Sequence, residues 1–177
     1  MNQMFMVIGA LVLLGIATLG INNMLANKTT TMLEAEASLN ATSLAQSMMD
    51  EVLGKSYDAA TANGTKIYDS TQFTAPGSLG PNATESAAVS QPDTSTPFKS
   101  VANYNDVDDY NNYRRVVSTP IMGKFTITDT VYYSVENNPD QKSNTQTSYK
   151  KVIVTVRHTN MSFPLQLTDV AVYRRYF

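Results

Sequence analysis

The sequence predicts an α+β fold, in which one long N-terminal α-helix packs on a C-terminal antiparallel β-sheet of about four strands. Three observations support this prediction: residues 1–27 have no charged side chain, residues 28–55 repeat apolar residues at helical spacing, and residues 113–177 alternate apolar and polar residues as strands do. Residues 56–112, between the helix and the strands, indicate a long irregular loop region. A chain of 177 residues has room for one head domain with its own core.

The N-terminal segment is apolar over nearly the length of a membrane span. Three interpretations compete: a secretory signal, a simple membrane anchor, and a helix that is stored in the membrane and from which a basic leader has been removed. A secretory signal needs a basic region before the apolar run and a small-residue cleavage site after it, and neither is present. An anchor usually has Lys or Arg near its cytoplasmic end, whereas the first cation is Lys28. The third interpretation fits best.

Poor helix formers interrupt this apolar segment. Each glycine costs a helix roughly 1 kcal/mol relative to alanine. We therefore predict a weak point of the helix at Gly15, Gly20, Asn22 and Asn23. Packed neighbouring helices could cover a stretched backbone there, or the glycines could simply permit close helix packing. Both explanations remain open.

Residues 28–55 continue as an amphipathic helix without proline. Gly54 followed by Lys55 predicts its C-terminal end. If both helical segments are continuous, they form a rod of roughly 80 Å. Its first half would pack against other rods, and its second half would lay an apolar stripe on the sheet. The apolar stripe recurs at steps of three or four residues and consists of Leu33, Ala37, Ala41, Leu44, Met48 and Val52.

The loop region and the strands follow from turn formers and from alternation. Residues 56–112 contain many Gly, Pro, Ser, Thr and Asn, and four isolated side chains could attach this region to the head: Tyr68, Phe73, Leu79 and Phe98. Strands are predicted at 113–119, 124–135, 149–159 and 164–176. The buried faces of the second and third strands are predicted to carry Phe125, Ile127, Val131, Tyr133, Val152, Val154 and Val156.

An uncharged apolar start followed by SLNATSLAQSMMDEVLGKSYD resembles proteins of the type IV pilin-like superfamily, especially minor pilins and type II secretion pseudopilins. Phe98 and residues 105–111 are similar to the aromatic and Asp-Asp-Tyr segment of minor pilins of the mannose-sensitive haemagglutinin type. These matches cover about half of the chain. One departure concerns the fifth position, where pilins usually carry a Glu thought to neutralise the N-terminal amine of a neighbour, and where this chain has Phe5.

The resemblance implies a structural subunit of an extracellular, type IV pilus-like filament. Before assembly the subunit would lie in the inner membrane, with its leader removed and Met1 methylated. The pilus assembly machinery would then insert it into a homo-oligomeric helical filament at the cell surface. Residues 1–27 would be the filament-core or membrane helix, residues 28–55 the helix that packs on the head, and residues 113–177 the β-sheet head. The core of the filament would contain Met1, Met4, Phe5, Val7, Ile8, Leu11, Val12, Leu14, Ile16 and Leu19.

A different class of function also fits the N-terminal segment. A singly membrane-anchored extracytoplasmic binding or adhesin module would use it as an ordinary anchor. Such a module predicts neither a removed basic leader nor extended polymers.

Charge is distributed unevenly along the chain. The net charge is −2, so nothing favours nucleic acid as a partner. Residues 28–112 are acidic and residues 113–177 are basic. The two parts could pair within one molecule or between copies, or they could form solvated faces that contribute little energy.

Asp106, Asp108 and Asp109 are weak candidates for a metal site, because they supply the oxygen ligands that calcium takes. The segment lacks the Gly and Glu positions of an EF-hand loop, so a calcium site would be of another type. The alternative is a loop whose Asp and Asn side chains cap turns.

No catalytic constellation is present, and we expect neither an enzyme nor a cofactor. The only histidine, His158, lies at a predicted strand end, where a structural role is more common than a catalytic one. The chain has no cysteine, which excludes disulfides and thiolate sites.

Five Asn-x-Ser/Thr triplets are candidates for N-glycosylation. About three would arise by chance in a chain this rich in Asn, Ser and Thr. The triplets begin at Asn27, Asn40, Asn63, Asn82 and Asn160.

Overall fold

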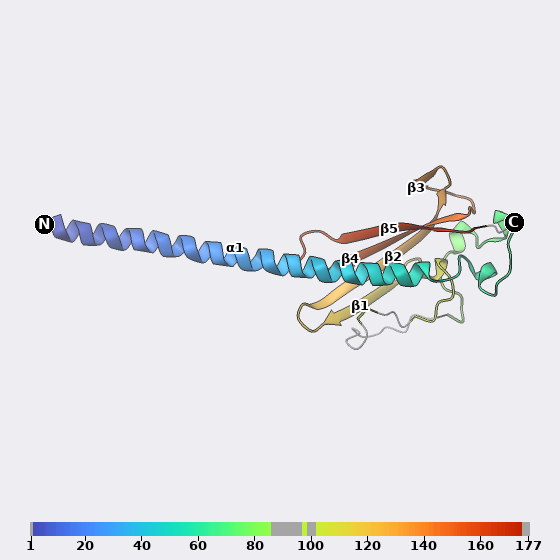
Figure 1. Ribbon diagram of the computed structural model, residues 1–177, viewed down its shortest axis with the longest axis horizontal. Helices are drawn as coiled ribbons and strands as arrows, with labels where there is room; N and C mark the ends of the chain where they lie inside the picture. Colours follow the sequence, from blue (N-terminus) through green and yellow to red (C-terminus); the bar gives the residue numbers. More distant parts are fainter. Residues whose placement is uncertain (1, 86–96, 99–101, 175–177) are drawn as a thin grey trace.

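The computed structural model describes residues 2–85, 97–98 and 102–174. A single long helix, α1 (Asn2–Leu53), extends from a head that contains a five-stranded antiparallel sheet. Figure 1 shows the first half of α1 projecting far beyond the head. The predicted α+β architecture is confirmed.

Helix α1 contains 52 residues without interruption, which corresponds to about 78 Å. The helix passes through the predicted weak point from Gly15 to Asn23. Within it, the hydroxyl of Thr18 donates to the carbonyls of Leu14 and Gly15 at 3.0 and 2.9 Å. The predicted weakness depends on packing against other copies, so it stays a prediction for the assembled state. At the other end, the N–H of Gly54 donates to the carbonyl of Asp50 at 3.0 Å.

The sheet has the strand order β1-β2-β4-β5, and all neighbouring strands are antiparallel. These strands are β1 (Arg114–Thr119), β2 (Gly123–Val135), β4 (Tyr149–Arg157) and β5 (Leu165–Val172). Each lies within one residue of the predicted start of a strand, but β4 ends two residues before its predicted end, and β5 ends at Val172 whereas the fourth strand was predicted to run to residue 176. Strands β1 and β2 form a tight hairpin that is closed by the pair Thr119 and Gly123. The φ of Gly123 is 78°, a conformation that favours glycine.

A fifth strand, β3 (Asn138–Lys142), lies between the second and third predicted strands, where no strand was predicted. It pairs with the end of β2 through Ser134 with Lys142 and Val135 with Asn138, across a register shift. Every residue of β3 is exposed. The strand therefore has no buried face and no alternation by which its sequence could have indicated it.

The loop region is ordered in its described part without being regular. It contains four short 3-10 helices: η1 (Ala59–Thr61), η2 (Ser70–Gln72), η3 (Pro76–Ser78) and η4 (Asp108–Tyr110). Phe73 is buried and Leu79 packs against the core, as predicted. Tyr68 and Phe98 are 70% and 45% exposed, so these two side chains do not attach the loop to the core.

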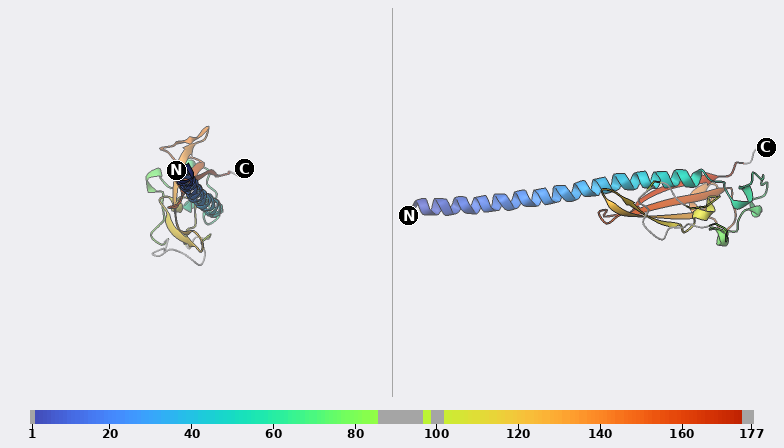
Figure 2. Two further views of the ribbon diagram at one scale, coloured as in Figure 1. Left: turned by 90° about the vertical axis from the view of Figure 1, so that its left-hand side faces the viewer. Right: turned by 90° about the horizontal axis from the view of Figure 1, so that it is seen from below.

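The core lies between the second half of α1 and one face of the sheet. Figure 2 shows the helix running along this face. The predicted stripe is buried from Ala37 onward, whereas Leu33 is 40% exposed because it lies at the rim of the head. All seven side chains predicted for the buried faces of β2 and β4 are buried. The helix contributes Ala41, Leu44, Ala45, Met48, Met49 and Val52 to the core.

Candidate functional site

The projecting part of α1 carries exposed apolar side chains throughout. Nine of the ten predicted filament-core residues have side chains that are 48–71% exposed, from Ile8 to Met4. The tenth, Met1, lies outside the described residues. An apolar helix exposed in this way needs a covering that residues 2–85, 97–98 and 102–174 do not provide.

This covering must surround the helix. The successive residues Leu11, Val12, Leu13 and Leu14 are 63%, 56%, 70% and 63% exposed. Because successive residues of an α-helix are about 100° apart, these four point in all directions around the axis. An 18-residue window of the helix has a mean hydropathy of 2.5 and no buried residue, so its length and composition would allow it to cross a membrane.

The glycines of the projecting helix pack against nothing in the described part of the chain. A methyl group added at Gly9, Gly15 or Gly20 would meet no atom of the described residues within 4 Å. No contact among these residues therefore offsets the loss of helix stability that each glycine causes. Glycines at these positions would allow a second helix to approach closely.

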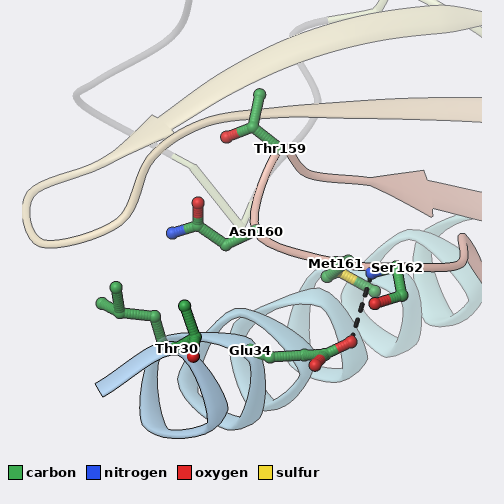
Figure 3. A pocket seen from close by; sticks show the side chains of 7 residues that line it. Thr30, Glu34, Thr159, Asn160, Met161 and Ser162 are labelled. Carbon is green, nitrogen blue, oxygen red and sulfur yellow. Dashed lines mark hydrogen bonds between the residues drawn. The ribbon is translucent and has the colours of Figure 1, made fainter. Parts of the chain in front are cut away.

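A hollow of about 330 Å³ lies where the helix enters the head. Figure 3 shows that Thr30 and Glu34 of α1 face residues 159–162 of the loop between β4 and β5. The N–H of Ser162 donates to Oε1 of Glu34 at 3.2 Å. Hydrogen bonding by Ser162 lowers the pKa of Glu34. These contacts hold the loop against α1 where the helix enters the head.

Inside the head, the ammonium of Lys150 is completely buried. Its Nζ lies 2.5 Å from Oδ1 of Asp108, 2.9 Å from Oδ2 of Asp58 and 2.7 Å from the carbonyl oxygen of Tyr57. The three donors of the ammonium thus have three acceptors. The rings of Tyr57 and Tyr133 lie 4.4 and 5.2 Å from Nζ and separate the site from water. The acidic and basic parts of the chain therefore pair here within one molecule.

Asp58 is held in place by the start of η1 and by the loop that follows. Its Oδ1 accepts from the N–H of Ala60 at 3.1 Å, and its Oδ2 accepts from the N–H of Thr74 at 3.0 Å. The hydroxyl of Tyr133 lies 3.3 Å from the same Oδ2. Burial alone would raise the pKa of Asp58, but the charge and hydrogen bond of Lys150, together with the two backbone N–H groups, lower it.

The three candidate metal ligands lie together around η4, but their contacts are those of turn caps and of the ion pair with Lys150. Asp106 Oδ1 accepts from the N–H groups of Asp108 and Asp109 at 2.9 and 3.3 Å. Asp109 Oδ2 accepts from the N–H groups of Asn105 and Asp106 at 3.0 and 3.2 Å. In the part of the chain that the structure describes, no three His, Cys, Asp or Glu side chains form a group that could hold a metal ion.

Burial changes the protonation of these carboxyl groups. Burial, together with the hydrogen bond and charge of Asp108, raises the pKa of Asp106 to about 9. Burial raises the pKa of Asp109 to about 6, and Glu85 adds to the effect. On the neighbouring strand, burial and the charge of Glu51 raise the pKa of Asp129 to about 8. Among the described residues, neither oxygen of Asp129 has a hydrogen-bond partner.

The other predicted site residues lie at the surface or in structural contacts. Asn27, Asn63, Asn82 and Asn160 are exposed, whereas Asn40 is half-buried and donates to the carbonyl of Glu36 at 2.9 Å. His158 stacks on Phe125 with ring centroids 4.2 Å apart, and its Nε2 lies 2.8 Å from the carbonyl oxygen of Met122.

No family model, curated protein or solved structure matches the chain. Two features of the chain stand out: the exposed apolar helix, which the sequence indicated, and the buried Lys150, which was not predicted. The strand alternation nevertheless indicates that Lys150 is buried, because it lies two residues from the buried Val152 and therefore on the same face of β4. In the same way, Asp129 lies on the face of β2 that carries the buried Ile127 and Val131.

Proposed function

We propose that the chain is a structural subunit of an extracellular filament of the type IV pilus kind, which polymerises through the projecting part of α1. In this proposal the subunit is stored in the inner membrane before assembly. A pilus assembly machinery then inserts it into a homo-oligomeric filament on the cell surface. The observation that carries the proposal is an apolar helix exposed on all sides and attached to a folded head. Such a helix suits both lipid and a bundle of identical helices.

The energetics favour a covered helix. Ten apolar side chains at roughly 2 kcal/mol each represent about 20 kcal/mol relative to water, and less relative to lipid. A free energy that favours the helix bundle over lipid must then come from close packing of the helices, for which Gly9, Gly15 and Gly20 leave room. No side chain before Lys28 is charged, so the bundle would bury no charged side chain. Phe5 adds apolar surface where pilins usually carry Glu.

A singly anchored binding module is the second candidate, and the membrane-length hydropathy of α1 favours it. Lipid alone would then cover the helix. Copies anchored in one bilayer lie at the same height, whereas copies in a filament are shifted along its axis. The two candidates therefore differ in which residues of neighbouring helices meet.

The absence of cysteine makes this difference measurable. We would place one cysteine at Val7 and a second at successive positions from Leu11 to Met24, and oxidise intact cells. A filament predicts disulfide-linked ladders for some pairs, because the two positions meet between shifted copies. A variant with cysteines at Val7 and at Thr168, an exposed residue of β5, is the control. An anchored module predicts dimers joined at equal heights and no ladder.

A further inference from the structure

Lys150 and Asp108 meet in a way that differs from an ordinary surface ion pair. Their side chains are 0% and 3% exposed, and Nζ lies 2.5 Å from Oδ1. The neighbouring residue Lys151 also pairs with an aspartate, Asp140, but that carboxylate is 88% exposed. Water can therefore solvate the carboxylate of the outer pair. The inner pair is held in contact without water to solvate it.

Two further carboxyl groups touch this pair. Asp58 Oδ2 lies 2.9 Å from Nζ and accepts a hydrogen bond from it. Asp106 is completely buried, its Oδ2 has no donor among the described residues, and its carboxyl is within hydrogen-bonding range of that of Asp108. A protonated Asp106 resolves this contact, because its O–H can donate to Asp108. The pKa of Asp106, raised to about 9, agrees with a proton held there at neutral pH.

From this geometry we propose that Lys150 and Asp108 condense into an intramolecular amide bond, so that the chain cross-links η4 to strand β4. Lys150 is the nucleophile and the carboxyl carbon of Asp108 is the electrophile. Asp58 is the base and Asp106 is the acid. The proposal is independent of filament formation.

The reaction balances within the four groups. Asp58 takes a proton from the ammonium, and Asp106 gives its proton to a carboxyl oxygen of Asp108. The amine then attacks the carboxyl carbon, and a C–N bond forms. One C–O bond breaks as the hydroxyl group leaves with the proton from Asp58, which releases one water molecule. The proton remaining on nitrogen returns to Asp106, so both helpers are regenerated and no oxidant or cofactor is needed.

The site supplies the conditions that this condensation requires. Contact between nucleophile and electrophile replaces a bimolecular encounter, which lowers the barrier through proximity. The rings of Tyr57 and Tyr133 border Nζ and exclude the water that would otherwise favour the free acid and amine. The carbonyl of Tyr57, at 2.7 Å, orients the nitrogen.

The amide bond would be a covalent cross-link within the head. The chain has no cysteine and hence no disulfide. Residues 108 and 150 are 42 positions apart in sequence, so the amide closes a large loop and restricts the unfolded chain. It joins the loop region to the centre of the sheet, since β4 lies between β2 and β5.

Mass spectrometry of the full-length chain in detergent tests the proposal directly. We expect the intact mass to be lower than the sequence mass by one water molecule, after N-terminal processing and any sugar are accounted for. Proteolysis should yield one branched peptide that joins Lys150 to Asp108. Recovery of an unmodified Lys150 peptide in full yield overturns the proposal. So does a water loss that maps elsewhere, such as a branch at Asp58.

Variants separate the chemistry from folding. Lys150→Arg should restore the missing water, whereas the matched variant Lys151→Arg should keep the lower mass. Asp106→Asn should leave the circular dichroism of the head unchanged and reduce cross-linking at least tenfold in a fixed time after refolding. Full cross-linking in Asp106→Asn would contradict the role of Asp106. If Lys150→Arg does not fold, the mass of the natural chain still decides the question.

Discussion

The hydroxyl of Tyr110 donates a 2.6 Å hydrogen bond to Oε1 of Glu51, and this bond joins the short helix η4 to the last turn of α1. Tyr110 is completely buried, and its ring makes edge contacts with Tyr104 and Tyr113 at 5.0 and 5.6 Å between centroids. Burial, followed by the hydrogen bond to Glu51, raises the pKa of Tyr110 above its ordinary value. The tyrosine therefore stays neutral and donates at physiological pH.

Replacing Tyr110 by Phe should lower the free energy of unfolding by about 1.5–3 kcal/mol, the range for a hydrogen bond to a charged group. The ring contacts stay, so the loss isolates the hydroxyl. Chemical denaturation of the full-length chain in detergent measures it. Tyr68→Phe is the matched control, because Tyr68 is 70% exposed and should change stability little. Equal stability of both variants would show that the bond does not hold η4 to the helix.

Asp129 should make the head less stable as pH rises. The folded chain keeps a proton on this group up to its pKa of about 8, whereas the unfolded chain releases it near the ordinary value of 3.8. The stabilising contribution is thus fully present below the ordinary pKa and is lost as pH rises through the raised one. Asp106 and Asp109 act with the same sign.

Asp129→Asn removes one of these titrations. We expect the fall in stability between about pH 4 and about pH 8 to be smaller in this variant than in the natural chain. Denaturation midpoints across this range measure the slope. Asp140→Asn, at an exposed position, should leave the slope unchanged. An unaltered slope in Asp129→Asn would mean that Asp129 is ionised in the folded head.

Gly15→Leu should block assembly without harming the subunit. A side chain at Gly15 meets nothing within the chain, and leucine forms helix better than glycine by about 0.8 kcal/mol. The helix should therefore be at least as stable, while close approach of a neighbouring helix is prevented. Thr42→Leu adds the same side chain to an exposed position of α1 beside the head.

The two variants should differ in the sheared extracellular fraction of cells that contain equal amounts of subunit. Gly15→Leu should reduce the assembled material at least tenfold, and Thr42→Leu should not. Normal assembly of Gly15→Leu would contradict the prediction that a neighbouring helix packs closely against this glycine.

The parts of the fold that were predictable from sequence are those with a repeating apolar pattern. The stripe from Ala37 to Val52 and the alternation around Val154 each bury one face, so periodicity located the helix and four strands. Strand β3 buries nothing and left no such pattern. The burial of Lys150 was not predicted, because a charged side chain is expected at the surface unless its partners are known. Its partners Asp58 and Asp108 are shown only by the folded structure. Those partners come from two distant parts of the loop region.

The central claim is that the projecting part of α1 is buried among copies of itself. Electron cryo-microscopy of material sheared from the surface of cells expressing the full-length chain tests it most directly. The account predicts helical fibres of this chain, with residues 4–19 packed in the core and the sheet heads outside. Recovery of the chain only as single copies in the membrane, with residues 4–19 in lipid and no fibres in the sheared fraction, would contradict it.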